Sequence, residues 1–167
     1  MELKDLRYIP RQIKQGIKNL FCWFPIIWND RNWDHYYFFK ILHFKLSNME
    51  KYLREYGMHI RGEQDANDIR KCILTLNRII EDDYTSNVFK HHDEKWGDIE
   101  ISFKEIPGND ELFEELLLTR TNTITEEDKK REKIASKHLY KKSAELEKQD
   151  LDYLFSMLNK HVKKWWD

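Results

Sequence analysis

The stretch that decides the fold is Arg31–Tyr56, RNWDHYYFFKILHFKLSNMEKYLREY, which contains neither glycine nor proline. Its apolar side chains recur at steps of three and four residues, the spacing of a helix face. One row comprises Phe38, Leu42, Leu46, Met49, Leu53 and Tyr56, and a second row beside it comprises Trp33, Tyr37, Ile41 and Phe44. Because the stripe is wide, we expect a central helix contacted from two sides. Asn29 or Asp30 suits its N-cap, and Gly57 suits its C-terminal stop.

Helical spacing continues on both sides of this stretch. Upstream, Gln12–Cys22 has apolar residues at helical spacing, and Pro25 should end or kink that helix. Downstream, a segment from Asp65 to about Asp83 has one clean apolar face. The loop Met58–Gln64 that joins the Arg31–Tyr56 helix to this downstream helix is short, so we expect these two long helices to be antiparallel neighbours.

The second half of the chain mixes patterns. Residues 84–125 break the helical spacing, and we expect an irregular insertion there. Within it, apolar residues alternate with polar ones around Trp96–Phe103, which suits a short strand, while Leu112–Leu118 suits a short helix. Thr125 and Asp128 have the spacing of a capping box ahead of an exposed, charged helix over residues 126–148. The segment Leu151–Trp166 is amphipathic again.

These patterns predict a mainly α protein. The expected architecture is an antiparallel helical bundle of three to four long helices with a small irregular or β-like insertion. No linker stands out, so we expect residues 1–167 to form a single helical domain. Gly and Pro together number only eight, which favours long helices over many short strands.

Composition excludes several classes of protein. Lys and Arg number 29 against 30 Asp and Glu, so the chain lacks the basic excess typical of non-specific nucleic-acid binding, and we expect no specific nucleic acid as a partner. The two cysteines, Cys22 and Cys72, have no CxxC spacing and fall in apolar helix patterns, so we expect both to be buried and inert in a reduced setting. The N-terminus lacks a signal-peptide pattern, which favours a cytoplasmic location.

One apolar run raises the question of a membrane. Leu20–Trp28, LFCWFPIIW, is far shorter than the about 20 apolar residues that cross a bilayer, and it contains a proline. Its tryptophans would also suit a membrane interface. We expect instead a buried entry segment that packs on the core, and no membrane partner.

Catalytic motifs are weak. His91, His92 and Asp93 resemble the His-Asp pair of helical metal-dependent phosphohydrolases, but no other segment supplies matching ligands, and solvated loop residues are the simpler interpretation. His35 and His43 lie about 12 Å apart along a helix, too far to share a metal. No GxSxG motif and no glycine-rich phosphate loop occur. We therefore expect no catalytic residue, no metal and no cofactor.

A ligand site is suggested where the long helix begins. Aromatic faces stack on bases, Arg binds phosphate in a bidentate manner, and a helix N-terminus favours anions. Basic groups also gather at the far end of that helix, about 40 Å away, where only a partner copy would bring them to the same ligand. The candidate ligand-binding residues are Trp28, Arg31, Trp33, Asp34, Tyr37, His59, Arg61, Arg70 and Trp166.

Two consecutive tryptophans, Trp165 and Trp166, come immediately before Asp167. One of the two can face the core, at helical spacing from Leu158 and Val162. The other must then face outward, over a neighbouring element, a second chain or a ligand.

Three segments together resemble a known group of proteins. WDHYYFFKILHFKLSNMEKYL (Trp33–Leu53), DIRKCILTLNRIIEDDY (Asp68–Tyr84) and LFSMLNKHVKKWWD (Leu154–Asp167) are similar to a family of small helical proteins encoded by tailed bacteriophages. The resemblance covers about half of the chain and carries over no catalytic residue. It implies a viral accessory protein that acts in the cytoplasm of the bacterial host cell.

The expected function follows from this resemblance and from the candidate site. We expect a non-catalytic phage accessory protein, a sponge that sequesters a nucleotide-derived small molecule, such as a signal of host defence. The alternatives are a protein–protein interaction module that binds a host protein through residues 126–148 or through Trp165 and Trp166, and a metal-dependent hydrolase that uses His92 and Asp93. Because the apolar surface exceeds what one small bundle hides, we expect a homo-oligomer.

Overall fold

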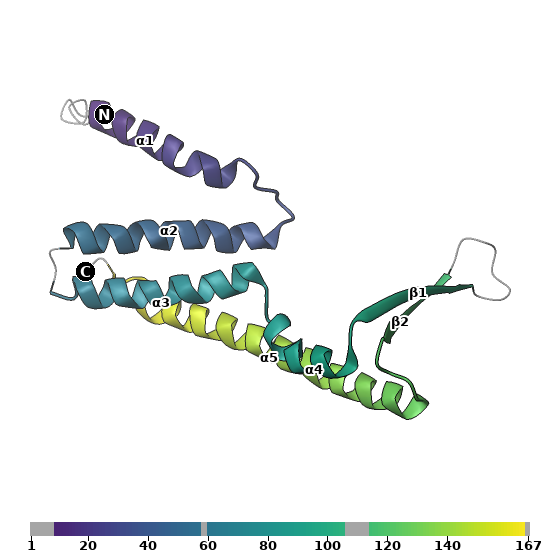
Figure 1. Ribbon diagram of the computed structural model, residues 1–167. Helices are drawn as coiled ribbons and strands as arrows, with labels where there is room; N and C mark the ends of the chain where they lie inside the picture. Colours follow the sequence, from purple (N-terminus) through teal and green to yellow (C-terminus); the bar gives the residue numbers. More distant parts are fainter. Residues whose placement is uncertain (1–8, 58–59, 106–113, 166–167) are drawn as a thin grey trace. The chain divides into compact units, whose positions relative to one another are not determined.

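The computed structural model describes residues 9–57, 60–105 and 114–165. These residues form a mainly α protein with one two-stranded antiparallel sheet, which confirms the predicted fold class (Figure 1). Its elements in chain order are α1 (Ile9–Ile27), α2 (His35–Tyr56), α3 (Gly62–Glu81), α4 (Ser86–Trp96), β1 (Ile99–Glu105), β2 (Glu114–Arg120) and α5 (Glu126–His161).

The chain divides into two compact units. The first comprises Met1–Glu81 and Leu154–Asp167, and therefore holds α1, α2, α3 and the C-terminal end of α5. The second comprises Asp82–Tyr153, with α4, the β-hairpin and most of α5. A single domain over residues 1–167 stays a prediction.

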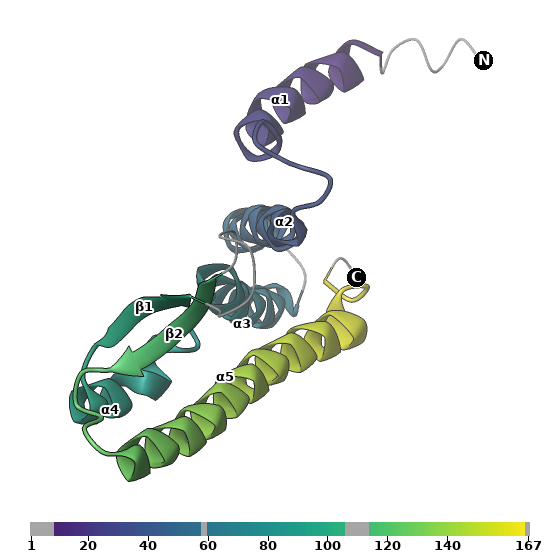
Figure 2. The same ribbon diagram turned by 90° about the vertical axis from the view of Figure 1, so that its right-hand side faces the viewer.

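In the first unit, α2 and α3 lie side by side in antiparallel orientation (Figures 1 and 2). Helix α3 is the more buried of the two, and its innermost side chains are Ala66, Ile69, Cys72 and Leu76. Helix α2 buries only Leu46, Met49 and Leu53, all in its C-terminal half. The expectation that α2 is contacted from two sides is confirmed, because α2 contacts α3 on one side and, more sparsely, α1 on another. The most buried helix is nevertheless α3 and not α2. The compact aliphatic face of α3 is buried, whereas Trp33 and Phe38 ahead of and within α2 are exposed.

The junction between α1 and α2 also differs from expectation. Helix α1 continues through Pro25 to Ile27 instead of ending there. Neither Asn29 nor Asp30 caps α2, because the cap is Asp34, whose Oδ1 accepts a hydrogen bond from the Tyr36 backbone N–H at 3.0 Å. A cap four residues later shortens the predicted helix at its start.

Of the two consecutive tryptophans, Trp165 is the one that the structure shows facing the core. The side chain of Trp165 is fully buried in the first unit, as is that of Leu154 on α5. The neighbouring Trp166 lies outside the described residues.

In the second unit, residues 86–96 form α4, where an irregular segment is expected. The segment contains no glycine or proline and ends at Gly97, whose φ of 77° is the left-handed conformation that favours glycine. A Cβ at this position would also overlap the Thr121 hydroxyl. The helix was missed because its buried side is short and aromatic, with Phe89, His92 and Trp96.

The short strand predicted from the alternation around Ile101 and Phe103 is confirmed, and it forms β1. It pairs with β2, so that Ile101 faces Leu118 and Phe103 faces Leu116. The short helix predicted over Leu112–Leu118 is wrong where the structure describes it, because residues from 114 onward are extended. Cross-strand pairing of these apolar side chains outweighs the local helix propensity of leucine.

Helix α5 is one continuous helix of 36 residues, about 54 Å long, where two segments are predicted. The capping box at its start is confirmed. The Asp128 backbone N–H donates to the Thr125 hydroxyl at 3.1 Å, and the Thr125 backbone N–H donates to the Asp128 carboxylate at 3.2 Å. Among the helices described in Figure 1, none is long and apolar enough to cross a bilayer.

Candidate functional site

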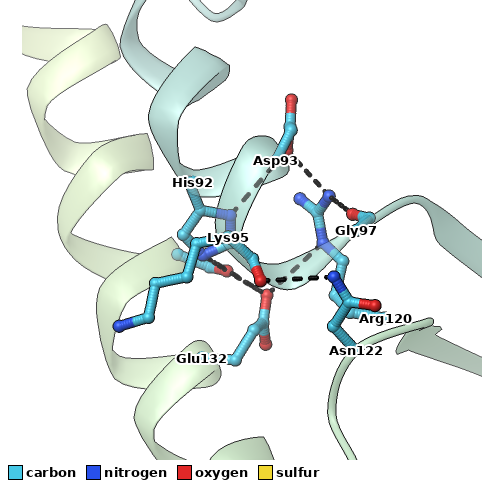
Figure 3. Close-up of polar contacts among 8 residues, drawn as sticks. His92, Asp93, Lys95, Gly97, Arg120, Asn122 and Glu132 are labelled. Carbon is cyan, nitrogen blue, oxygen red and sulfur yellow. Dashed lines mark hydrogen bonds and ion pairs between the residues drawn. The ribbon is translucent and has the colours of Figure 1, made fainter.

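The His-Asp pair singled out from the sequence lies on α4 (Figure 3). The three adjacent side chains point to different surroundings. His91 is exposed and pairs with Glu94, His92 is buried, and Asp93 is half exposed beside Arg120. The helix turns by about 100° per residue, so neighbours in sequence do not share a face.

Arg120, the last residue of β2, is the centre of this polar cluster. Its guanidinium donates to the Asp93 carboxylate at 2.7 Å and to the Gly97 carbonyl at 2.9 Å. Its Nε lies 3.6 Å from a carboxylate oxygen of Glu132 on α5. The side chain is only 9% exposed. Arg120 thus ties the end of the hairpin to α4 and α5, which is a positioning role within the second unit.

His92 faces Ser136 and Glu132 on α5. Its Nε2 lies 3.3 Å from the Ser136 hydroxyl and 3.6 Å from the Glu132 carboxylate. The Ser136 hydroxyl in turn donates a hydrogen bond to the Glu132 carboxylate at 2.5 Å. In a nucleophilic triad the acid holds the opposite ring nitrogen and the serine donates to the histidine. Here serine and acid share the same ring nitrogen, so this group is not arranged to activate Ser136.

The opposite ring nitrogen of His92 is also informative. Nδ1 is buried without a hydrogen-bond partner in the described part of the chain, and the nearest carboxylate oxygen, on Asp93, is 3.8 Å away. Within the described ranges, no three His, Cys, Asp or Glu side chains gather closely enough to hold a metal ion. Because Asp93 is engaged by Arg120, the described geometry gives the metal-dependent hydrolase no support.

The two cysteines differ from each other. Cys72 is fully buried in α3, and burial, aided by the nearby Asp68 carboxylate, raises its pKa to about 11. Its thiol is therefore inert, as predicted. Cys22 is exposed on α1, so the expectation that it is buried is wrong. Cys22 does lie in a helix, as the spacing predicts, but on the side of α1 that faces away from most of the apolar side chains of that helix.

The candidate ligand residues at the start of α2 do not share one pocket. Trp28, Arg31 and Trp33 lie on the surface, with Trp33 82% exposed. The Arg31 guanidinium donates to the neighbouring Asp30 carbonyl, and Asp34 caps α2. Only Tyr37 lines a described cavity.

The candidate residues at the other end of α2 are engaged in ion pairs. Arg61 lies 3.8 Å from the buried carboxylate of Asp65, and Arg70 lies 3.6 Å from the partly buried carboxylate of Glu50. His59 and Trp166 lie outside the described residues. Arg61 and Arg70 therefore have local partners for their charges.

A cavity of about 290 Å³ opens in the first unit beside Tyr37. The Lys40 ammonium sits 4.6 Å from the centre of the Tyr37 ring. The cavity has no carboxylate among its lining residues, which are Pro25, Ile26, Tyr37, Lys40, His43, Phe44, Asn77 and Ile80. Cation, aromatic face and amide together suit a small anionic, ring-bearing ligand. The sequence does not single out Lys40 or Asn77, because each is a single polar residue on an otherwise amphipathic helix, and it suggests His43 only as a metal ligand.

A cavity of about 430 Å³ in the second unit is the larger of the two. It is lined by Thr85, Ser86, Phe89, Asp93, Asp98, Ile99, Arg120 and Tyr140. The Phe89 and Tyr140 rings, 4.7 Å apart, belong to facing helices. Its two carboxylates against one arginine, itself paired with Asp93, make it a poorer site for an anion.

The β-hairpin exposes an apolar face. The alternation in β1 and β2, with the observed register, puts five large side chains on one side of the sheet. Each of the five is between 49% and 66% exposed: Ile99, Ile101, Phe103, Leu116 and Leu118. We call these five residues the hairpin face. The sequence carried the signal in the alternation of β1, but β2 was assigned to a helix, so the face was not predicted.

None of the protein-family models, curated proteins or solved structures compared with this chain matches it.

Proposed function

We propose that this protein is a non-catalytic interaction module that assembles through the hairpin face. The observation that carries the proposal is the row of five exposed apolar side chains on one side of a two-stranded sheet. A contiguous apolar patch on a small protein marks an interaction surface more often than chance exposure does. A phage origin and a host-protein partner remain proposals that rest on the sequence resemblance.

The occupant proposed for this face is the same face of a second copy. A two-stranded hairpin is marginally stable by itself, so packing against another sheet stabilises it. Two identical apolar faces match each other in chemistry, and a two-fold axis places them in contact without any further element. This assignment accords with the homo-oligomer expected from the sequence.

The test measures molar mass by light scattering across a range of protein concentrations. We expect a dimer for the unmodified chain and a monomer for the double variant Phe103→Ser, Leu118→Ser. The matched control, Glu100→Ser with Thr119→Ser, changes the opposite side of the same strands and should stay dimeric. An unmodified chain that is monomeric at all concentrations, or a double variant that still dimerises, contradicts the proposal.

The sequestration of a nucleotide-derived ligand is a second candidate, favoured by the cavity beside Tyr37. Lys40 and His43 supply cationic or donor groups, and the Tyr37 and Phe44 rings supply stacking faces. This site retains only Tyr37 of the residues expected from the sequence.

A thermal-shift screen with adenosine monophosphate, cyclic nucleotides and ADP-ribose tests this candidate. We expect a stabilising shift with one of them that Lys40→Gln reduces and that the exposed control Lys51→Gln leaves unchanged. No shift with any of these compounds counts against ligand sequestration and leaves the assembly proposal unaffected.

A further inference from the structure

Helix α1 carries an apolar stripe that no described residue covers. Five of its side chains recur at steps of four, three, four and three residues, and each is 45% to 65% exposed: Ile13, Ile17, Leu20, Phe24 and Ile27. Phe21 and Trp28 border the stripe and are 79% and 67% exposed. The expectation that Leu20–Trp28 is a buried entry segment is therefore wrong. We call the first five residues the α1 stripe.

The α1 stripe is not the side by which α1 contacts the rest of its unit. The Trp23 ring meets the Phe44 ring of α2 edge-on, with 4.9 Å between their centres. Ile26, one turn further, lines the cavity beside Tyr37. At about 100° per residue, Trp23 and Ile26 lie to one side of the stripe. Helix α1 thus attaches through one side and presents another, more apolar side outward, and it extends away from α2 in both views (Figures 1 and 2).

The charge of α1 is one-sided as well. The segment Ile9–Ile27 contains Arg11, Lys14 and Lys18 and no acidic residue, although the whole chain has a net charge of -1. All three cations are exposed and free of any described ion pair. They follow one another around the helix next to the Phe21 edge of the stripe, so a surface that accepts the stripe also meets the cations. The complement of α1 is therefore apolar and anionic together.

We propose that α1 binds the surface of an anionic phospholipid membrane, lying in the plane of the interface. An apolar stripe flanked by Lys and Arg, with Trp and Phe at its border, is the pattern of interfacial helices. The stripe enters the boundary between headgroups and acyl chains, while Arg11, Lys14 and Lys18 meet lipid phosphates. The bound helix lies on the membrane and does not span it. This proposal uses a different surface from the hairpin face and does not depend on assembly.

The apolar and electrostatic parts of the interaction are separable. Each basic residue near an anionic membrane strengthens binding by roughly fivefold, an effect that salt screens. Lys14→Gln with Lys18→Gln should therefore weaken binding roughly 25-fold at low salt. The double variant Ile17→Ser, Leu20→Ser removes the centre of the α1 stripe without changing the charge. It should weaken vesicle binding more than the replacement of one lysine alone does.

The experiment is co-sedimentation of the full chain with vesicles. One set consists of phosphatidylcholine, and the other contains phosphatidylserine as well. We expect binding to the second set only, which decreases with added salt. The control for the stripe variant is Gln12→Ser with Gln15→Ser, which changes two exposed polar side chains of α1 outside the α1 stripe and should bind like the unmodified chain. Circular dichroism measures whether each double variant keeps its fold, which we expect because all six changed positions are exposed.

Two outcomes overturn the proposal. The first is absence of binding to phosphatidylserine vesicles, or equal binding to both sets. The second is a stripe variant that binds vesicles normally but changes the molar mass in light scattering, which would assign the α1 stripe to contacts between copies. Loss of vesicle binding with an unchanged molar mass supports the lipid assignment.

Discussion

At the scale of single residues, Arg120 shows how one side chain organises the second unit. It is nearly buried, and it satisfies a carboxylate of α4, the carbonyl that ends α4 and a carboxylate of α5. A charge in such a setting is stabilising only while its partners remain, because an unpaired buried charge is costly. Arg120 is therefore a structural residue in spite of its place beside the larger cavity.

Removal of Arg120 should destabilise the fold. We expect Arg120→Ala to lower the free energy of unfolding by about 2 kcal/mol, through loss of charged hydrogen bonds. The control is Arg131→Ala, whose exposed pair with Glu127 is worth less than about 0.5 kcal/mol. Urea denaturation followed by circular dichroism measures both. Equal losses for the two variants would contradict the role given to Arg120.

The two thiols should differ sharply in reactivity. Because burial raises the pKa of Cys72 to about 11, its thiolate is scarce at neutral pH, whereas Cys22 is exposed. With a disulfide reagent near pH 8, the folded chain should release one equivalent rapidly and a second only on denaturation. The Cys22→Ser variant should release none while folded. Rapid reaction of that variant would show that α3 is not packed as described.

At the scale of elements, the start of α5 depends on its capping box. Thr125→Ala removes the hydroxyl that accepts from the Asp128 N–H and should cost about 1 kcal/mol. Hydrogen bonds from the Thr125 side chain and backbone hold the pKa of Asp128 below its usual value. A lowered pKa in the folded state means stability that is present above the unfolded pKa and is lost as pH falls through the folded one.

Asp128→Asn tests this pH dependence. The unmodified chain should be more stable than the variant at neutral pH, and the difference should shrink as the pH falls below the usual range of an aspartate. Thermal unfolding at a series of pH values measures it. A difference that grows on acidification has the wrong sign and would contradict the capping role of Asp128.

Elements with one strong periodic pattern could be predicted, and those that depend on distant partners could not. Helices α2 and α3, strand β1 and the α5 cap follow from local spacing. Helix α4 and strand β2 do not: α4 is stabilised by α5 through Phe89 and Tyr140, and β2 by its register with β1. Of the candidate site residues that the structure describes, Tyr37 lines the cavity in the first unit. The sequence suggests Asp34 as a ligand group although it caps α2, because a capping carboxylate and a ligand acceptor have the same sequence signature.

At the scale of the whole molecule, the chain's last turn holds part of its core. Trp165 is fully buried, although only two residues, Trp166 and Asp167, follow it in the sequence. Trp165→Ala should cost about 3–5 kcal/mol, the range for a fully buried aromatic side chain. Truncation before Trp165 should lower the thermal midpoint similarly. The control Lys163→Ala changes an exposed neighbour and should be nearly neutral. Unchanged stability on truncation would refute the anchoring role.

Gly97 has a consequence for how this chain tolerates sequence change. Its backbone conformation disfavours every side chain, and the space where a Cβ would stand is filled by Thr121. A partly exposed position outside any helix or strand ordinarily accepts most amino acids. In a saturation library sorted for folded protein, position 97 should instead be as intolerant as Leu76, and even alanine should be depleted. A single glycine at the surface would then limit sequence drift here as strictly as the interior does.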